Sequence, residues 1–269
     1  TIAEPENYPP EARAILEKLG IVSEGPFDRR TLQSSLENTD VLIVRLGHLI
    51  NAEIFDYAPR LKAIVSATTG LDHIDRQAAS KLSVSVISLK GETEFLETIH
   101  ATAELTWALL LAVLRNLPQA TNSVRDGNWD RDKFRGQEAC GKRLGILGLG
   151  RLGRMVAGYG KAFGMTVSAY DPYTDNWSDK IIRCPNIGAL LKTSDVLSIH
   201  LPLNEETENM ISTEELSLLP NGAIVINTAR GAILDEAALA EAIRSGQIAG
   251  VGLDVLANEN SEKSSNSPI

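Results

Sequence analysis

The sequence predicts an α/β protein with two domains, each a parallel sheet covered by helices on both faces. Short apolar runs alternate with helical patterns along nearly the whole chain, which is typical of that architecture. The 269 residues, 43% of them apolar, are enough for two hydrophobic cores. A glycine-rich turn at 145–153 starts a second α/β series. We expect the domains to be 1–97 and 98–262, followed by a mobile polar tail at 263–269.

The first part of the chain is expected to hold three strands and their covering helices. A helix is predicted from Pro10 to Leu19, because proline favours the first helical turn and Gly20 favours a stop. The next elements are strands at 41–45, 63–67 and 84–88 and helices at 52–57 and 72–81.

A long apolar helix should follow at 98–116, and Pro118 should end it. Residues 121–142 have turn chemistry and a single aromatic anchor, Trp129, and they predict an exposed polar connection.

The second part repeats the α/β pattern. A helix is predicted at 151–163, and another one begins at the N-cap Asp235 and ends at Gly246. The strands of this part are predicted at 143–147, 166–170, 196–200, 223–227 and 249–254.

The turn at 145–153 has the G-x-G-x-x-G pattern between a strand and a helix. Gly148 permits a tight turn, Gly150 lets the backbone approach a pyrophosphate, and Gly153 lets the helix pack on the strand. The helix N-terminus offers unpaired N–H groups to the phosphates. Asp171 follows Gly153 by eighteen residues and should accept hydrogen bonds from the adenine-side ribose. The pattern predicts a dinucleotide site that favours NAD, because the charge of Asp171 repels the extra phosphate of NADP. The alternative is a glycine-rich turn beside an ordinary surface Asp.

Composition limits the classes of partner. The net charge is −9 and no block of Lys or Arg stands out, so nucleic acid and anionic membrane surfaces are not expected partners. The most apolar stretch, 101–114, is too short to span a bilayer. Cys140 and Cys184 have neither metal-ligand nor disulfide spacing, and they suit a reducing cytoplasm. No metal site is predicted, and no signal peptide is recognised.

Three further segments follow strands of the second sheet, on the side where open α/β sheets bind ligands. Arg230 suits a carboxylate held by two parallel hydrogen bonds, and a structural ion pair is an equal alternative. Asp254 and Glu259 can orient an imidazole or an amide, or be solvated loop charges. His200, at another strand end, is more often a structural residue than a catalyst.

Taken together, these segments resemble the D-isomer-specific 2-hydroxyacid dehydrogenase family. The resemblance runs through essentially the whole chain. The matching motifs are Ser66 to Asp75, Ala101 to Glu104, Gly127-Asn128-Trp129, the glycine turn, and the segments around His200, Arg230 and Asp254. In that family the fold is a flavodoxin-like substrate domain with a Rossmann NAD-binding domain.

The resemblance implies an NAD-dependent oxidoreductase that interconverts a small D-2-hydroxy acid and its 2-oxo acid, as a homodimer. Arg230 would grip the substrate's carboxylate and carbonyl oxygen, and Glu259 would orient and charge a catalytic histidine. Substrate would also contact Arg45, Leu46, Gly47, Thr69 and Gly70. The cofactor would contact Gly148, Gly150, Arg151, Leu152, Gly153, Asp171, Pro172, His200, Leu201, Pro202, Thr228, Ala229, Arg230 and Asp254. The reaction requires side chains of these types. Hydride delivery to a 2-oxo acid leaves negative charge on the carbonyl oxygen, which requires a nearby cation and a proton donor.

The family's acid–base histidine lies in a Pro-His-x-Gly-like segment beyond the Glu, and residues 1–269 contain none. The histidines present, His48, His73, His100 and His200, belong to other motifs, and none is assigned as proton donor. One hypothesis is an active dehydrogenase whose final segment follows residue 269. The other is a relative that binds NAD without catalysis, with a regulatory role.

Overall fold

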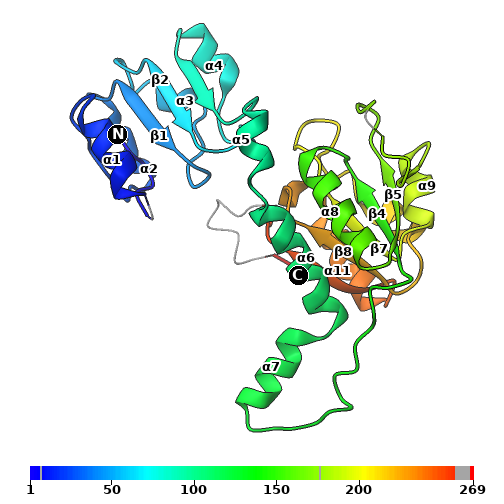
Figure 1. Cartoon of the computed structure of the whole chain (residues 1–269). Helices are drawn as coiled ribbons and strands as arrows, with labels where there is room; N and C mark the ends of the chain where they lie inside the picture. Colours follow the sequence, from blue (N-terminus) through cyan, green and yellow to red (C-terminus); the bar gives the residue numbers. More distant parts are fainter. Residues whose placement is uncertain (7, 176, 258–266) are drawn as a thin grey trace. The chain divides into compact units, whose positions relative to one another are not determined.

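The computed structural model describes residues 1–6, 8–175, 177–257 and 267–269. It divides into two compact units, Thr1–Leu96 and Glu97–Ile269 (Figure 1). Both units are parallel α/β structures, so the predicted fold class is confirmed. Of the predicted tail at 263–269, only residues 267–269 are described, and there the Ser267 hydroxyl donates to Glu236.

The first unit is built on a three-stranded parallel sheet in the order β1-β2-β3. The segment at Ile2 adds a parallel bridge to Ile43 beside β1. Apolar side chains such as Leu42 and Ile64 alternate inward and pack against Leu32 and Leu36. The elements of this unit are α1 Pro10–Glu17, α2 Arg29–Leu36, β1 Val41–Val44, α3 Ala52–Phe55, β2 Ala63–Ser66, α4 Arg76–Lys81 and β3 Ser85–Ser88.

The second unit is built on a six-stranded parallel sheet in the order β6-β5-β4-β7-β8-β9. Numbered from β4, this is the 3-2-1-4-5-6 order of a doubly wound dinucleotide-binding sheet. Its strands are β4 Arg143–Leu147, β5 Thr166–Tyr170, β6 Ile182–Arg183, β7 Val196–Ile199, β8 Ala223–Asn227 and β9 Ile248–Leu253. The order reverses at β4, so a ligand crevice is expected at the carboxyl end of β4.

Helices cover both faces of this sheet. On one face α6 (Ala101–Leu114) and α8 (Arg151–Ala162) pack on β4, β5, β8 and β9. On the other face lie α9 (Ile187–Lys192), α10 (Thr213–Leu218) and α11 (Glu236–Arg244) (Figure 1). The central strands β4, β5, β7 and β8 are largely buried, which explains their continuous apolar runs.

The region after the long helix differs from the prediction. The helix expected at 98–116 is α6, preceded by a separate short helix, α5 (Thr93–Glu97). Residues 121–125 do not belong to a polar connection, because they lie in a further helix, α7 (Leu117–Arg125). Asn116, in a left-handed conformation (φ +51°), ends the first helix, and Pro118 lies in the first turn of the second. The exposed connection therefore begins only after Arg125.

By length and composition alone, the stretch Thr93–Leu114 is able to cross a membrane. The core helix of a globular domain passes the same test. In the structure Trp107, Leu110 and Leu114 of this stretch are buried in the cluster between α6, α8 and the sheet. The packing of α6 therefore accounts for its apolar composition.

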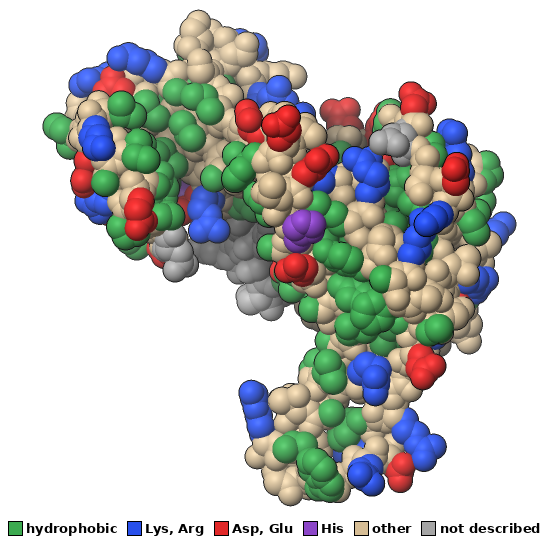
Figure 2. Space-filling model, viewed as in Figure 1, with side chains coloured by type: hydrophobic (Ala, Val, Ile, Leu, Met, Phe, Trp, Pro, Cys, Tyr) green, Lys and Arg blue, Asp and Glu red, His purple; other side chains and the backbone are tan. Residues whose placement is uncertain are grey.

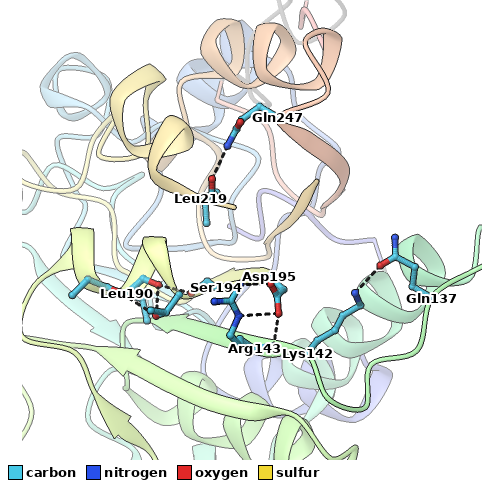
Figure 3. Close-up of polar contacts among 10 residues, drawn as sticks. Gln137, Lys142, Arg143, Leu190, Ser194, Asp195, Leu219 and Gln247 are labelled. Carbon is cyan, nitrogen blue, oxygen red and sulfur yellow. Dashed lines mark hydrogen bonds and ion pairs between the residues drawn. The ribbon is translucent and has the colours of Figure 1, made fainter. Parts of the chain in front are cut away.

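An ion pair joins two parallel strands at the amino ends of the second sheet (Figure 3). Asp195, just before β7, accepts hydrogen bonds from the backbone N–H of Arg143 (2.9 Å) and from its guanidinium (3.1 and 2.5 Å). These hydrogen bonds hold the pKa of Asp195 below its ordinary value. This ion pair lies at the amino ends of the strands, opposite the expected crevice, so we infer that its role is to stabilise the fold.

We expect Asp195→Ala to lower the free energy of unfolding by about 1–2 kcal/mol at neutral pH, because three hydrogen bonds to a charged group are lost at a partly exposed site. The deficit should shrink as the pH falls through the pKa of Asp195, since protonation weakens the wild-type pair. Urea titrations over a pH series measure both effects. Asp132→Ala, which removes the exposed pair with Arg135, is the matched control and should change little. Equal losses in the two variants would contradict the assignment.

Candidate functional site

The glycine turn after β4 has the geometry that its sequence predicts. Gly148 has φ +92°, and a Cβ there would lie 2.6 Å from the carbonyl oxygen of His200. At Gly153 a Cβ would lie 2.1 Å from the carbonyl oxygen of Gly148, so only glycine lets the helix approach the strand so closely. A Cβ on Gly150, in contrast, would meet no atom of residues 1–6, 8–175, 177–257 and 267–269 within 4 Å. Packing therefore explains two of the glycines, and open space remains at the third.

The first turn of α8 adjoins this open space. Gly150 is the N-cap, with no side-chain hydrogen bond to the cap, and Arg151 and Leu152 form the first turn. The amino end of a helix carries the positive end of the helix dipole, which favours an anion there. The Arg151 guanidinium donates to the carbonyl oxygen of Ile99 (2.7 Å), so it secures the start of the helix.

Asp171 lies at the carboxyl end of β5, beside the turn. It accepts hydrogen bonds from the backbone N–H of Leu149 (2.8 Å) and from that of Tyr173 (2.9 Å). One carboxylate oxygen is used by each amide, which fixes the orientation of the group, and each oxygen retains a further lone pair for a hydroxyl donor. Pro172, next to Asp171, is exposed.

His200, Leu201 and Pro202 follow β7 on the other side of β4. The His200 ring pairs with the Ser198 hydroxyl (Nε2 to Oγ, 2.8 Å). Burial lowers the pKa of His200 to about 4, so the ring is neutral near pH 7. Leu201 is half-buried and Pro202 exposed. The His200 ring is therefore held in its neutral form at the strand end by Ser198.

The pKa of His200 makes stability depend on pH. In the unfolded chain the His200 ring takes up a proton near pH 6.5, whereas in the folded chain it does so only near pH 4. The stability that neutral His200 contributes is therefore fully present above about pH 6.5 and is lost as the pH falls. The free energy of unfolding drops by about 2 kcal/mol between pH 7 and pH 5 on this account. His200→Gln keeps a hydrogen-bonding group for Ser198 and should remove this part of the loss in urea titrations. Parallel profiles for the variant and the wild type would contradict the prediction.

The segment after β8 holds Arg230 in a defined backbone. Asn227 is fully buried; its side-chain amide donates to the carbonyl oxygen of Arg230 (2.9 Å), and its amide oxygen accepts from Ala229 (3.0 Å). Thr228 pairs through its hydroxyl with Thr106 of α6 (2.7 Å). The Arg230 guanidinium donates to the carbonyl oxygen of Ala229 (2.8 Å), and its side chain is half-buried. Asn227, which sequence reasoning did not select, is thus the residue that shapes this loop.

The next strand end supplies the remaining acids. Asp254 is exposed directly after β9, and its backbone N–H donates to the carbonyl oxygen of Asn227 (3.0 Å). Glu259 lies outside the described residues. The chain leading towards it packs on the Arg230 loop, since a Cβ on Gly231 would lie 2.0 Å from the carbonyl carbon of Leu256. Gly231 therefore allows the two segments to touch.

In the first unit, the predicted substrate residues lie at the carboxyl ends of the neighbouring strands β1 and β2. Arg45, Leu46 and Gly47 follow β1, and Thr69 and Gly70 lie in the loop after β2. The backbone N–H groups of Arg45 and Gly47 donate to the carboxylate of Glu4 (2.5 and 2.6 Å). A hollow of about 320 Å³ lies at this edge, lined by residues that include Glu4, Tyr8, Arg45 and Ala67. Glu4, which sequence reasoning missed, thus holds the loop through the two amides.

The other histidines have different surroundings. His73 is buried, with Nε2 3.4 Å from the Ser66 hydroxyl, in the unit that carries Thr69 and Gly70. His48 is half-buried, and His100 is exposed at the N-terminus of α6.

The strand ends β4, β5, β7, β8 and β9 all lie at one edge, because parallel strands end on the same side. That edge brings together the predicted residues of the second unit, from Gly148 to Asp254. The Arg45 and Thr69 loops belong to the first unit.

Comparisons with known proteins identify similar chains. The family model described as "D-isomer specific 2-hydroxyacid dehydrogenase, NAD binding domain" matches residues 107–268. A D-3-phosphoglycerate dehydrogenase from Methanocaldococcus jannaschii is 38% identical over 93% of this chain and 47% of its own length. A hydroxypyruvate reductase from Thermotoga maritima is 36% identical over 89% of this chain and 76% of its own. The chain thus spans about half the length of several curated relatives that it matches.

Solved structures share the fold over almost the whole of this chain. A D-lactate dehydrogenase from Aquifex aeolicus, in complex with NAD and lactic acid, superposes with a TM-score of 0.83 at 31% identity. It covers 96% of this chain, which covers 77% of that one.

Proposed function

Because the chain belongs to the D-isomer-specific 2-hydroxyacid dehydrogenase family, we propose that it interconverts a D-2-hydroxy acid and its 2-oxo acid with NAD as the hydride carrier. The open space at Gly150 carries the proposal: no atom of the described residues accounts for this glycine, whereas a pyrophosphate at the first turn of α8 would. The residues of the turn therefore fit the cofactor.

Each part of the second unit has a task in this proposal. NADH, when bound, supplies the hydride. Asp171 accepts hydrogen bonds from the adenine-side ribose, and Leu201 and Pro202 flank the adenosine. Thr228, Ala229 and Asp254 orient the nicotinamide.

Arg230 binds the carboxylate and carbonyl oxygen of the substrate. Its fixed positive charge stabilises the negative charge that develops on that oxygen during reduction. The guanidinium also aligns the acceptor carbon by a two-point grip. Arg45, Leu46, Gly47, Thr69 and Gly70 contribute the remaining substrate contacts, and Glu259 supports a histidine that donates the proton.

The assay that tests this function follows NADH absorbance with the full-length protein and a panel of 2-oxo acids. The panel includes glyoxylate, hydroxypyruvate, pyruvate and phosphohydroxypyruvate. Oxidation of NADH with one or more of them is expected. Tight NADH binding with no oxidation on any acid would replace the enzyme by the non-catalytic, NAD-binding alternative. Failure to bind NADH would reject both.

We propose further that the active form is a homodimer that pairs through α6, α7 and the connection up to residue 142. This region exposes Leu117, Val124 and Trp129, the last at 80%. Figure 2 shows apolar side chains on the surface of the lower lobe, where Figure 1 places α7. Apolar side chains in that number favour burial against a partner.

Trp129→Asp combined with Val124→Asp should halve the mass measured by light scattering, because the charges oppose burial of this surface. Ile15→Asp, on exposed α1, is the control and should leave the mass unchanged. A double variant that keeps the wild-type mass would show that the copies pair elsewhere.

A further inference from the structure

A side-chain hydrogen bond joins the loops that follow β5 and β7. The Tyr173 hydroxyl donates to Oε2 of Glu206 at 2.7 Å. In the sheet β5 and β7 lie on either side of β4, so this bond spans the carboxyl end of β4. That is where the strand order reverses and where a doubly wound sheet binds its ligand. The bond therefore borders the proposed cofactor site, beside the adenosine residues Asp171 and Pro202.

Both partners project from turns that are tied down by hydrogen bonds. The Tyr173 N–H donates to Asp171, and the Glu206 N–H donates to the side-chain oxygen of Asn204 (2.9 Å). The Thr207 hydroxyl closes the second turn by donating to the carbonyl oxygen of Pro202 (2.7 Å). Such Asx turns restrict the backbone, so the bond between the two exposed side chains needs little additional ordering.

The bond ties a second carboxylate to the loop that holds Asp171. Asp171 and Glu206 are linked through one tyrosine residue, by its backbone N–H at one end and its hydroxyl at the other. Within the described ranges, no ion pair joins a lysine or arginine to either carboxylate. Hydrogen bonding to Glu206 also raises the pKa of Tyr173, so the hydroxyl keeps its proton. The adenosine edge is therefore negative on two sides.

We propose that Glu206, held in place by Tyr173, is a second determinant that favours NAD over NADP. The inference rests on the proposed function, which puts the adenine-side ribose at Asp171. A 2′-phosphate on that ribose carries between one and two negative charges and would face both carboxylates. Since Glu206 is exposed, its repulsion is screened by salt and amounts to a few-fold in affinity.

Dissociation constants for NADH and NADPH test this directly, measured by calorimetry at low and at high salt. Glu206→Gln keeps an acceptor for the Tyr173 hydroxyl and removes only the charge. It should tighten NADPH binding about three- to fivefold at low salt and leave NADH within about twofold. Tyr173→Phe keeps the charge and frees it to move, so its gain should be smaller. Glu205→Gln, the adjacent exposed acid, is the matched control and should change neither constant. Asp171→Ala provides the reference for loss of the first carboxylate, with weaker NADH binding and a relaxed preference.

An unchanged ratio of the two constants in Glu206→Gln would overturn the inference. Equal changes for both cofactors would also overturn it, because Glu206 would then only shape the loop. Either result leaves the proposed function intact as long as the wild-type protein binds NADH. A wild-type protein that binds neither cofactor would overturn the proposed function and this inference together.

Discussion

Replacing Arg230 by alanine should lower kcat/KM for the 2-oxo acid about a thousandfold and leave the dissociation constant of NADH nearly unchanged. Removal of a group that stabilises the developing oxyanion costs two to three orders of magnitude in rate. Loss of the carboxylate grip adds to the effect on KM. The backbone of the loop should persist, because Asn227 holds it through the carbonyl oxygen of Arg230 and the N–H of Ala229. Initial rates and NADH titrations on the same preparation measure the two effects separately.

Two further variants sharpen this result. Arg230→Lys keeps the charge and loses the planar fork, so it should recover only part of the activity. Arg244→Ala removes an exposed arginine of α11 and should behave as the wild type. If Arg230→Ala weakened NADH binding as strongly as it lowered the rate, the arginine would serve the cofactor or the fold, and its substrate role would be wrong.

Gly150→Val should abolish tight NADH binding and lower the free energy of unfolding by only about 1 kcal/mol, because valine is a poorer N-cap than glycine. The backbone of Gly150 is extended (φ −68°, ψ −163°), which valine also adopts, and no atom in the described part of the chain opposes a new Cβ. The side chain would instead occupy the space assigned to the pyrophosphate. Overpacking of that kind costs about 1–3 kcal/mol, which is about a ten- to hundredfold loss of affinity. Calorimetric titration and a thermal melt of the same sample measure binding and stability.

Gly153 and Gly158 of α8 supply the contrast. Gly153→Ala should lower the free energy of unfolding by about 2–4 kcal/mol, because its Cβ would collide with the carbonyl oxygen of Gly148. Gly158 is exposed and a Cβ there meets nothing, so Gly158→Ala should add about 0.5–1 kcal/mol and leave NADH binding unchanged. Unaltered NADH affinity in Gly150→Val would contradict the proposal that the pyrophosphate binds at this turn.

Five of the six described strands of the second unit were predicted, because apolar runs mark buried strands. The short, exposed β6 has no such run and was missed. Three of the five, β4, β5 and β8, have the bounds that the sequence predicts. Short helices were missed although some have capping signals, such as Ser212 with Glu215 before α10 and Asp28 with Thr31 before α2. The break at Asn116 needed a left-handed residue, which its sequence alone does not require.

The predicted site residues were found from motifs that follow strands, and parallel strands bring those ends to one edge. Contacts between loops could not be predicted from the sequence, because they depend on the order of the strands in space. Tyr173 meets Glu206 only because β5 and β7 flank β4, and Glu4 reaches the Arg45 loop only after the first segment pairs beside β1. The sequence assigns none of the four histidines as proton donor. Their surroundings in the structure leave that assignment unchanged.

The most direct measurement follows the hydride itself. The full-length protein is incubated with a 2-oxo acid and NADH that carries deuterium at the transferring position of the nicotinamide. We expect one deuterium at the second carbon of a D-2-hydroxy acid for each NADH consumed, and none with Arg230→Ala on the same time scale. A product without deuterium, or protein that binds NADH and leaves every 2-oxo acid unchanged, would contradict the account of this chain as a dehydrogenase.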